Sequence, residues 1–176
     1  MSTLHRRRFV AALAAAPWLT QAAQAALPSA PRVLSFAHLH TGERLELEYA
    51  RGTDYLPDAL TAVNRLLRDF RSGEVGAMDP ALLDLLHALH GRLGSRRPFE
   101  IISGYRSPAT NRMLHERSSG VASGSLHMSG RAIDVRLADV PLERLRDAAL
   151  GLGGGGVGYY PGSNFVHVDT GRVRRW

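Results

Sequence analysis

The sequence predicts a single α+β domain built around a central, mainly antiparallel β-sheet with helices on its flanks. Its 176 residues suit one domain. Apolar residues make up 44% of the chain, enough for one hydrophobic core. Segments with strand periodicity and segments with helix periodicity alternate irregularly, without the βαβ succession of a parallel sheet. No internal repeat or second domain boundary is visible, so residues 27–176 are predicted to form the domain behind a leader at 1–26.

Two strands and a helix are expected first. Residues 33–37 and 44–49 are rich in apolar side chains, and the second segment alternates apolar and polar residues as a half-buried strand does. The residues between them, 40–43, have the composition of a turn. A helix is predicted over 58–71, because its apolar residues recur at helical spacing: Leu60, Val63, Leu67 and Phe70.

The remaining elements follow from the same patterns. Asp79 and Pro80 open a second helix, since an acceptor side chain followed by proline is typical of a helix N-terminus. Further strands are expected at 99–102, 132–137, 157–160 and 165–168, and further helices at 109–117 and 142–150. The Gly- and Ser-rich residues 120–130 predict a loop. A turn at Pro161 and Gly162 predicts a hairpin from the last two strands.

The composition excludes several kinds of chemistry. There are no cysteines, which rules out thiolate metal sites and thiol nucleophiles and leaves His and carboxylate side chains as metal ligands. All basic residues are arginine, so no lysine is available for a Schiff base or a phosphate-binding loop. The net charge is +6, and Arg6, Arg7 and Arg8 contribute half of it. The remaining charge of +3 argues little for nucleic acid, so no nucleic-acid partner is expected, and it is compatible with an anionic polymer such as cell wall.

Residues 1–26 have the three parts of a secretory signal. Arg6–Arg8 precede the small apolar run 10–16, and an Ala-rich segment ends at Ala26. The arginines followed by Phe9 resemble a twin-arginine signal, a route that carries folded proteins; the alternative is an ordinary signal with a rich basic region. The apolar run is far shorter than the ~20 residues that span a bilayer, so we expect a periplasmic protein without a membrane span.

Polar residues suited to catalysis gather in the C-terminal half. His127 precedes Asp134 by seven residues, and His167 lies in an apolar strand two residues before Asp169. Strand side chains alternate, so His167 and Asp169 are predicted to share one face. Three N and O ligands with one position left for water form the usual catalytic zinc site. The alternative is that Asp134 and His167 simply hydrogen-bond to each other, with His127 apart on a loop.

Several motifs in one order give the chain a family resemblance. They are the segments 103–107 (SGYRS), 125–134 (SLHMSGRAID), 155–161 (GGVGYYP) and 165–171 (FVHVDTG). With these motifs the chain resembles the zinc D,D-peptidases that act on peptidoglycan and share their fold with the metal-binding domain of hedgehog proteins. Within that family it is most similar to the periplasmic murein endopeptidases, from the leader to Trp176.

The resemblance implies a role for each matching residue. His127, Asp134 and His167 match the family's zinc ligands, so one Zn²⁺ per chain is expected. Arg106 matches the arginine that points at the substrate carbonyl or carboxylate near the zinc. Its guanidinium can stabilise a developing oxyanion without proton transfer. The alternative for Arg106 is a structural salt bridge.

The general base is where the sequence departs from the family pattern. Many relatives carry Glu or Asp three residues before the last zinc-binding His, whereas this chain has Asn164, which cannot serve as a base. Asp169 is the nearest carboxylate expected on the right face. Two roles stay open for it: base or proton shuttle, or a residue that orients His167 or another ligand. His115 and Glu116 are weaker candidates, because both fall on a helix predicted to face solvent.

These expectations combine into a zinc-dependent peptidoglycan hydrolase. We expect a monomeric murein endopeptidase that hydrolyses peptide cross-links, either D-Ala–diaminopimelate or diaminopimelate–diaminopimelate. The first alternative is a D,D-carboxypeptidase, which requires a closed pocket for a free carboxylate. The second is a zinc-stabilised domain that binds cell wall without cutting it. Asn164 supports this second alternative, and the intact zinc ligands oppose it.

Overall fold

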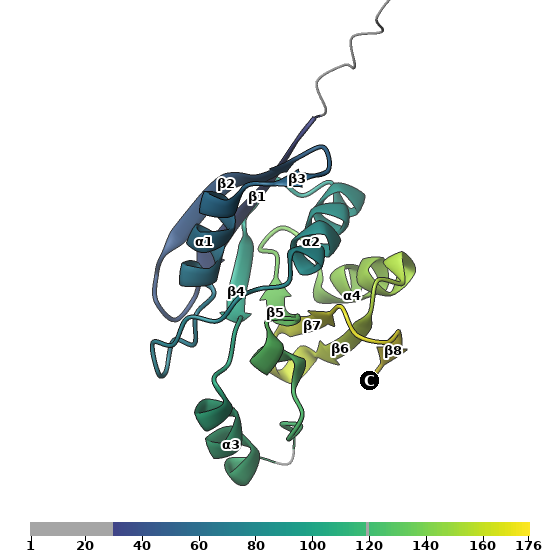
Figure 1. The fold of residues 1–176 in the computed structure, drawn as a ribbon. Coiled ribbons are helices and arrows are strands. Elements are labelled where there is room, and N and C mark those ends of the chain that lie inside the picture. The colour runs from purple at the N-terminus through teal and green to yellow at the C-terminus, as the bar shows by residue number, and fades with distance from the viewer. Residues whose placement is uncertain (1–29, 119) are drawn as a thin grey trace, which may run out of the picture.

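The computed structural model describes residues 30–118 and 120–176, so the predicted leader at 1–26 lies outside the described residues. The described chain folds around an eight-stranded sheet with the order β3-β2-β1-β4-β5-β7-β6-β8 (Figure 1). The strands are β1 Pro31–His38, β2 Arg44–Arg51, β3 Asp54–Tyr55, β4 Phe99–Ser103, β5 Ala132–Arg136, β6 Gly156–Tyr160, β7 Phe165–Asp169 and β8 Arg174–Arg175. Neighbouring strands are antiparallel except β1 with β4 and β6 with β8. The predicted α+β class with a mainly antiparallel sheet is therefore confirmed.

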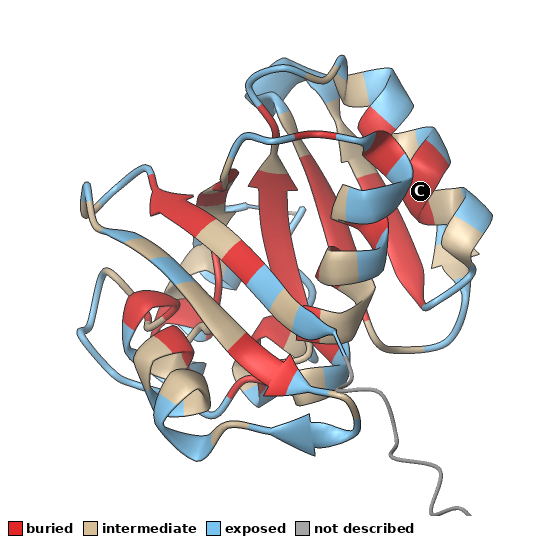
Figure 2. Ribbon diagram, turned by 90° about the horizontal axis from the view of Figure 1, so that it is seen from above, coloured by how far each residue is buried: buried red, intermediate tan, exposed pale blue. Residues whose placement is uncertain are grey.

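Three of the helices cover the sheet. The helices are α1 Pro57–Leu66, α2 Pro80–Leu93, α3 Pro108–Arg117, α4 Leu142–Leu152 and the short 3-10 helices η1 Leu126–Ser129 and η2 Pro161–Ser163. The hydrophobic core lies between the sheet and α1, α2 and α4, and Figure 2 shows buried residues running along the central strands. Helix α3 instead projects away from the sheet (Figure 1). None of the helices in the described part of the chain is long and apolar enough to cross a bilayer.

Helix α2 begins and ends where the local sequence predicts. The Asp79 carboxylate accepts a hydrogen bond from Ala81 N, and Pro80 occupies the first turn, where an N–H would have no partner in the helix. Gly94 follows the last turn in the left-handed region, with a φ of 65°. The predicted start is confirmed, and the leucines on the inner side of the helix are buried: Leu82, Leu83, Leu86, Leu89 and Leu93.

Helix α1 is shorter than the sequence predicts. The apolar spacing predicts a helix over 58–71, but α1 ends at Leu66. The chain turns there because the Asp69 carboxylate accepts hydrogen bonds from the backbone N–H groups of Arg71 and Ser107. A short polar side chain that binds nearby backbone in this way competes with helix formation. Asp69 thereby joins the turn after α1 to the loop after β4.

The two outermost strands are also missing from the prediction. β3 and β8 contain two residues each, too few for an alternating pattern. The other predicted strands and helices begin and end within two residues of the observed ones. Part of the predicted loop at 120–130 is the short helix η1, which carries a residue of the site described next.

Candidate metal centre

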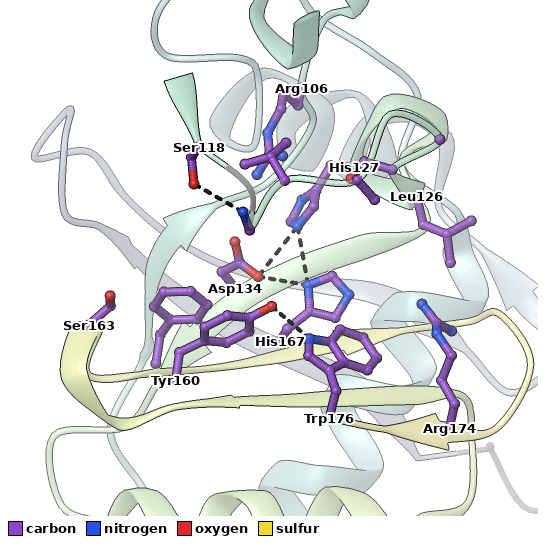
Figure 3. A pocket seen from close by; sticks show the side chains of 16 residues that line it. Arg106, Ser118, Leu126, His127, Asp134, Tyr160, Ser163, His167, Arg174 and Trp176 are labelled. Carbon is purple, nitrogen blue, oxygen red and sulfur yellow. Dashed lines mark hydrogen bonds and ion pairs between the residues drawn. The ribbon is translucent and has the colours of Figure 1, made fainter. Parts of the chain in front are cut away.

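The three predicted metal ligands come together from three elements. Asp134 lies on β5 directly opposite His167 on β7, because the antiparallel register pairs these two residues. The ring of His127, on η1, faces Asp134 and His167 (Figure 3). Its Nδ1 is 2.7 Å from the carbonyl oxygen of Gly104, which holds the ring. One atom from each ligand lies within 4.8 Å of the others. All three side chains are buried or nearly so.

The separations of the three ligand atoms fit a small tetrahedral ion. His127 Nε2 is 3.3 Å from His167 Nδ1 and 3.4 Å from Asp134 Oδ1, and His167 Nδ1 is 2.8 Å from Asp134 Oδ1. Ligand atoms about 2.0–2.1 Å from a tetrahedral zinc lie ~3.3–3.4 Å from one another. Two separations match this value and one is shorter. The alternative in which His127 lies apart on a loop does not describe this structure.

The carboxylate of the site is held in its charged form. Burial alone would raise the pKa of Asp134, but the charge and hydrogen bonds of His127 and His167 hold it well below the usual range of an aspartate. An ionised carboxylate beside two imidazole nitrogens is a donor set that suits a divalent cation such as zinc. The residues present therefore fit the metal that the sequence predicts.

Asp169 lies behind His167 rather than in front of it. Its carboxylate is fully buried and accepts from His167 Nε2 at 3.2 Å. It also accepts from the backbone N–H groups of Gly156 and Gly171, at 3.0 and 2.8 Å, and from the guanidinium of Arg174 at 2.7 Å. Burial would raise the pKa of Asp169, but these donors hold it low. A carboxylate in this position fixes the ring and tautomer of a metal-binding histidine.

A cleft of about 540 Å³ opens over the three ligands. One wall comes from Arg106 and the segment that ends in η1. The other wall comes from the β6–β7 hairpin and β8, with Tyr160, Phe165, Arg174 and Trp176 (Figure 3). Asp134 has the only side-chain carboxylate among the described residues that line the cleft.

Arg106 faces the cleft without an ion-pair partner in the described part of the chain. Its Nη1 donates to Asn111 Oδ1 at 3.3 Å, and its Nε is buried and has no hydrogen-bond partner among the described residues. Its backbone N–H donates to the carbonyl oxygen of His127, so the arginine and the ligand turn are linked. The alternative of a structural salt bridge does not apply within this part of the chain.

Asp69 supports the Arg106 loop and was missed by sequence reasoning. Its carboxylate accepts from Ser107 N at 3.0 Å, and the Ser107 hydroxyl in turn accepts from Thr110 N at the start of α3. Burial would raise the pKa of Asp69, but hydrogen bonds from Thr110, Ser107 and Arg71 lower it to about 2. In the sequence, Asp69 is visible only as an acidic residue at the end of the apolar face of a predicted helix. This position does not indicate which groups its carboxylate binds.

The other residues weighed from the sequence lie outside the cleft. Asn164 is exposed in the turn before β7 with a φ of 54°, a conformation that asparagine adopts more readily than most residues. His115 binds the carbonyl oxygen of Val121 and Glu116 is exposed. The turn explains why asparagine occupies position 164. Because this position lies outside the cleft, the absence of a carboxylate there does not remove a base from the cleft.

The fold and the site together define a class of metallopeptidase. An α+β domain with a His–Asp–His group beneath a cleft and an arginine on its wall is the arrangement expected for zinc peptidases that act on peptidoglycan. The family model described as "Peptidoglycan L,D-endopeptidase MepK" matches residues 26–176, and the chain belongs to this family. The family resemblance inferred from the motifs is thereby confirmed.

Individual relatives agree with the family match. The chain is 47% identical over 146 residues to the "Peptidoglycan L,D-endopeptidase MepK" of Escherichia coli strain K12, covering 83% of this chain and 80% of that protein. The protein of the same name from Shigella flexneri gives the same values. It is 46% identical over 147 residues to the "Probable peptidoglycan L,D-endopeptidase MepK" of Haemophilus influenzae, covering 83% of this chain and 79% of that protein.

Proposed function

We propose that this chain is a zinc-dependent murein endopeptidase that hydrolyses peptide cross-links in peptidoglycan. The observation that carries the proposal is the convergence of His127, Asp134 and His167 beneath a cleft whose wall holds Arg106. The donor set favours zinc, because two imidazoles and one carboxylate leave a coordination position open for water. One ion per chain is proposed.

The names of the relatives favour one of the two cross-links. All three relatives are called L,D-endopeptidases. A diaminopimelate–diaminopimelate cross-link joins the carboxyl of an L-centre to the amine of a D-centre, whereas a D-Ala–diaminopimelate cross-link joins two D-centres. We therefore propose the diaminopimelate–diaminopimelate bond as the substrate of this chain. Release of a terminal D-Ala, as by a D,D-carboxypeptidase, is an outcome that the experiment below would detect.

The residues of the cleft have distinct proposed roles. Zinc held by the three ligands would supply a Lewis acid for the scissile carbonyl and lower the pKa of a bound water. Arg106 stabilises the negative charge that develops on the carbonyl oxygen, because its guanidinium faces the cleft and forms no ion pair in the described part of the chain. Of the two roles left open for Asp169, we propose the orienting one. Its oxygens already accept from His167, two backbone N–H groups and Arg174.

Export of the chain is part of the proposal. The leader at 1–26 has the parts of a signal peptide and a twin-arginine pattern, and the substrate of the relatives is a cell-wall polymer. We propose a periplasmic monomer that leaves the cytoplasm by the twin-arginine route. A fusion of residues 1–26 to a reporter, compared with the same fusion carrying Arg6–Arg8→Lys, would test the route by its dependence on the arginines.

The central experiment is a digest of peptidoglycan rich in diaminopimelate–diaminopimelate cross-links, with and without a chelator, read by mass spectrometry. We expect dimeric muropeptides to become monomers and the chelator to stop the reaction. Release of single D-Ala residues would identify a carboxypeptidase instead. Bound zinc without any cleavage would support the cell-wall-binding alternative.

A further inference from the structure

Four strands place one row of residues across the sheet beside the metal centre. The register pairs Asp134 on β5 with His167 on β7, and His167 with Gly158 on β6. Strand β8 pairs in parallel with β6, so Trp176 comes to lie beside Gly158. Two backbone hydrogen bonds hold it there, from Trp176 N to Val157 O and from Tyr159 N to Trp176 O. The row therefore runs from a metal ligand to a tryptophan.

The side chain of Trp176 reaches the metal centre because the residue between them is glycine. A Cβ added to Gly158 would lie 2.7 Å from Trp176 Cε2, so any other residue would push the indole away. The indole and the ring of His167 are 5.2 Å apart between centroids and inclined by 51°. The neighbouring row has the same arrangement: the side chain of Arg174 passes over Gly156, and its guanidinium binds Asp169.

The indole is fixed although it is half exposed. Its Nε1 donates to Tyr160 Oη at 2.6 Å, and the Arg174 guanidinium lies 4.8 Å from its ring (Figure 3). Trp176 nevertheless remains 49% exposed and lines the cleft. A large apolar surface held in one orientation at the edge of a cleft is the kind of surface that binds a ligand.

We propose that Trp176 is a substrate-binding residue that selects the diaminopimelate residue next to the scissile bond, a proposal that rests on the proposed function. The metal ligands mark the position of the scissile carbonyl. The indole lies against His167, so only a group within about one residue of that carbonyl can reach it. Diaminopimelate presents a run of methylene groups with charged groups at both ends. Its methylene groups pack on the indole, on the wall opposite the Arg106 that faces the scissile carbonyl.

Steady-state kinetics on a diaminopimelate–diaminopimelate cross-linked dimer test the proposal. Trp176→Ala should raise KM and lower kcat/KM by about tenfold or more, as removal of a central aromatic contact does. Trp176→Phe should retain part of the activity, and both variants should keep the wild-type zinc content. Val173→Ala is the matched control, since Val173 is 67% exposed near the same strand and does not line the cleft. It should behave as wild type.

A binding measurement separates contact from fold. Trp18→Phe leaves Trp176 as the single tryptophan of the sequence. Its emission should change when the full chain is titrated with the diaminopimelate-containing product peptide, free of glycan. Gly158→Ala, which displaces the indole, should weaken that response without loss of zinc.

The possible outcomes decide between the proposals. If wild type cleaves the dimer and Trp176→Ala cleaves it equally well, the role of Trp176 is overturned and the proposed function stands. Loss of zinc together with activity in Trp176→Ala and Trp176→Phe would indicate a structural role and also overturn it. If Trp176→Ala cleaved glycan-bearing substrate poorly but the glycan-free dimer normally, Trp176 would contact the sugar rather than the peptide, which contradicts the proposal. If wild type cleaves no cross-link, the proposed function itself fails.

Discussion

Two arginine–aspartate pairs lie near opposite edges of the sheet and differ in their surroundings. Near one edge, Arg32 on β1 binds Asp84 on α2, and both side chains are partly exposed to solvent. Near the other edge, Arg174 on β8 binds Asp169 at the end of β7, whose carboxylate is fully buried and contacts the metal ligand His167. The residue types are the same, but only the second pair has a fully enclosed carboxylate and belongs to the site.

The difference teaches that the surroundings of an ion pair decide its importance. Asp84 also accepts hydrogen bonds from the hydroxyl groups of Tyr49 and Tyr55. The residues near β3 are therefore held by several contacts, of which the solvent-exposed ion pair is only one. Asp169 has no access to water, so removal of its partner leaves a buried charge without compensation. The first pair contributes little to stability, and the second holds the geometry of the metal centre.

The largest effect is expected from removing the residue that the buried pair supports. His167→Ala should lose zinc and lower activity to background, because two ligands cannot hold the ion as three do. His87→Ala is the matched control, since His87 packs beside Tyr49 in the other half of the molecule. Zinc per chain by elemental analysis is the measurement. Full zinc content in His167→Ala would contradict the assignment of the site.

Removing the cation of the buried pair should come next. Arg174→Ala should lower the free energy of unfolding by about 3 kcal/mol, the low end for breaking a buried pair, because Asp169 keeps its backbone donors. Urea unfolding followed by circular dichroism measures it. Arg175→Ala, an exposed neighbour, should leave the midpoint unchanged. Equal midpoints for both variants would show that the buried pair is no more important than an exposed charge.

The third variant keeps the shape of Asp169 and removes its charge. Asp169→Asn should weaken zinc binding by about 10–100-fold, as substitutions of residues that hydrogen-bond to a metal ligand do. Added zinc should restore most of the activity. Competition with a chelator measures the affinity. If the variant instead held zinc normally and lost kcat, the base role predicted from the sequence would be supported over the orienting role.

Asp69 extends the comparison to a buried carboxylate that forms no ion pair in the described part of the chain. Hydrogen bonds lower its pKa to about 2, below the ~3.9 of an unfolded aspartate. The stability that it contributes is therefore fully present above about pH 4 and is lost as the pH falls through about 2. We expect Asp69→Asn to be less stable than wild type at neutral pH and to show a flatter decline over that acid range. Parallel acid limbs in urea titrations would refute this.

The smallest effect is expected at the exposed pair. Arg32→Ala should barely move the urea midpoint and should leave activity and zinc content unchanged, because solvent screens the pair and Tyr49 and Tyr55 still bind Asp84. A loss of stability as large as that of Arg174→Ala would remove the distinction between the two pairs.

Local patterns in the sequence predicted most of the fold. The start of helix α2 was predicted from Asp79 and Pro80, and the hairpin of β6 and β7 from its turn, because caps and turns act over a few residues. The end of α1 was wrong because it depends on Ser107, which is 38 residues away from Asp69 in the chain. Contacts at that distance leave no trace in a local pattern.

In the candidate site, too, local patterns predicted some features, whereas contacts between distant residues determine the others. His127, Asp134 and His167 followed from spacing and family motifs, and alternation predicted that His167 and Asp169 share a face. The role of Asp169 stayed open because alternation gives a face but not the number of donors around a carboxylate. The contribution of Trp176 was missed because it depends on a glycine in a neighbouring strand and on a two-residue strand that no periodicity reveals.

The two edge strands have a consequence for behaviour at high concentration. An exposed strand edge offers unpaired backbone groups on which another chain can add a strand, the route by which many sheet proteins aggregate. In the described chain both edges, β3 and β8, are only two residues long, and β8 consists of Arg174 and Arg175. On the β3 side most of β2 also lies at the edge, because only Ala50 and Arg51 pair with β3, but β2 carries the charged residues Arg44, Glu46 and Glu48, which oppose an incoming strand. The sheet should therefore resist growth into fibres even when the protein is highly concentrated.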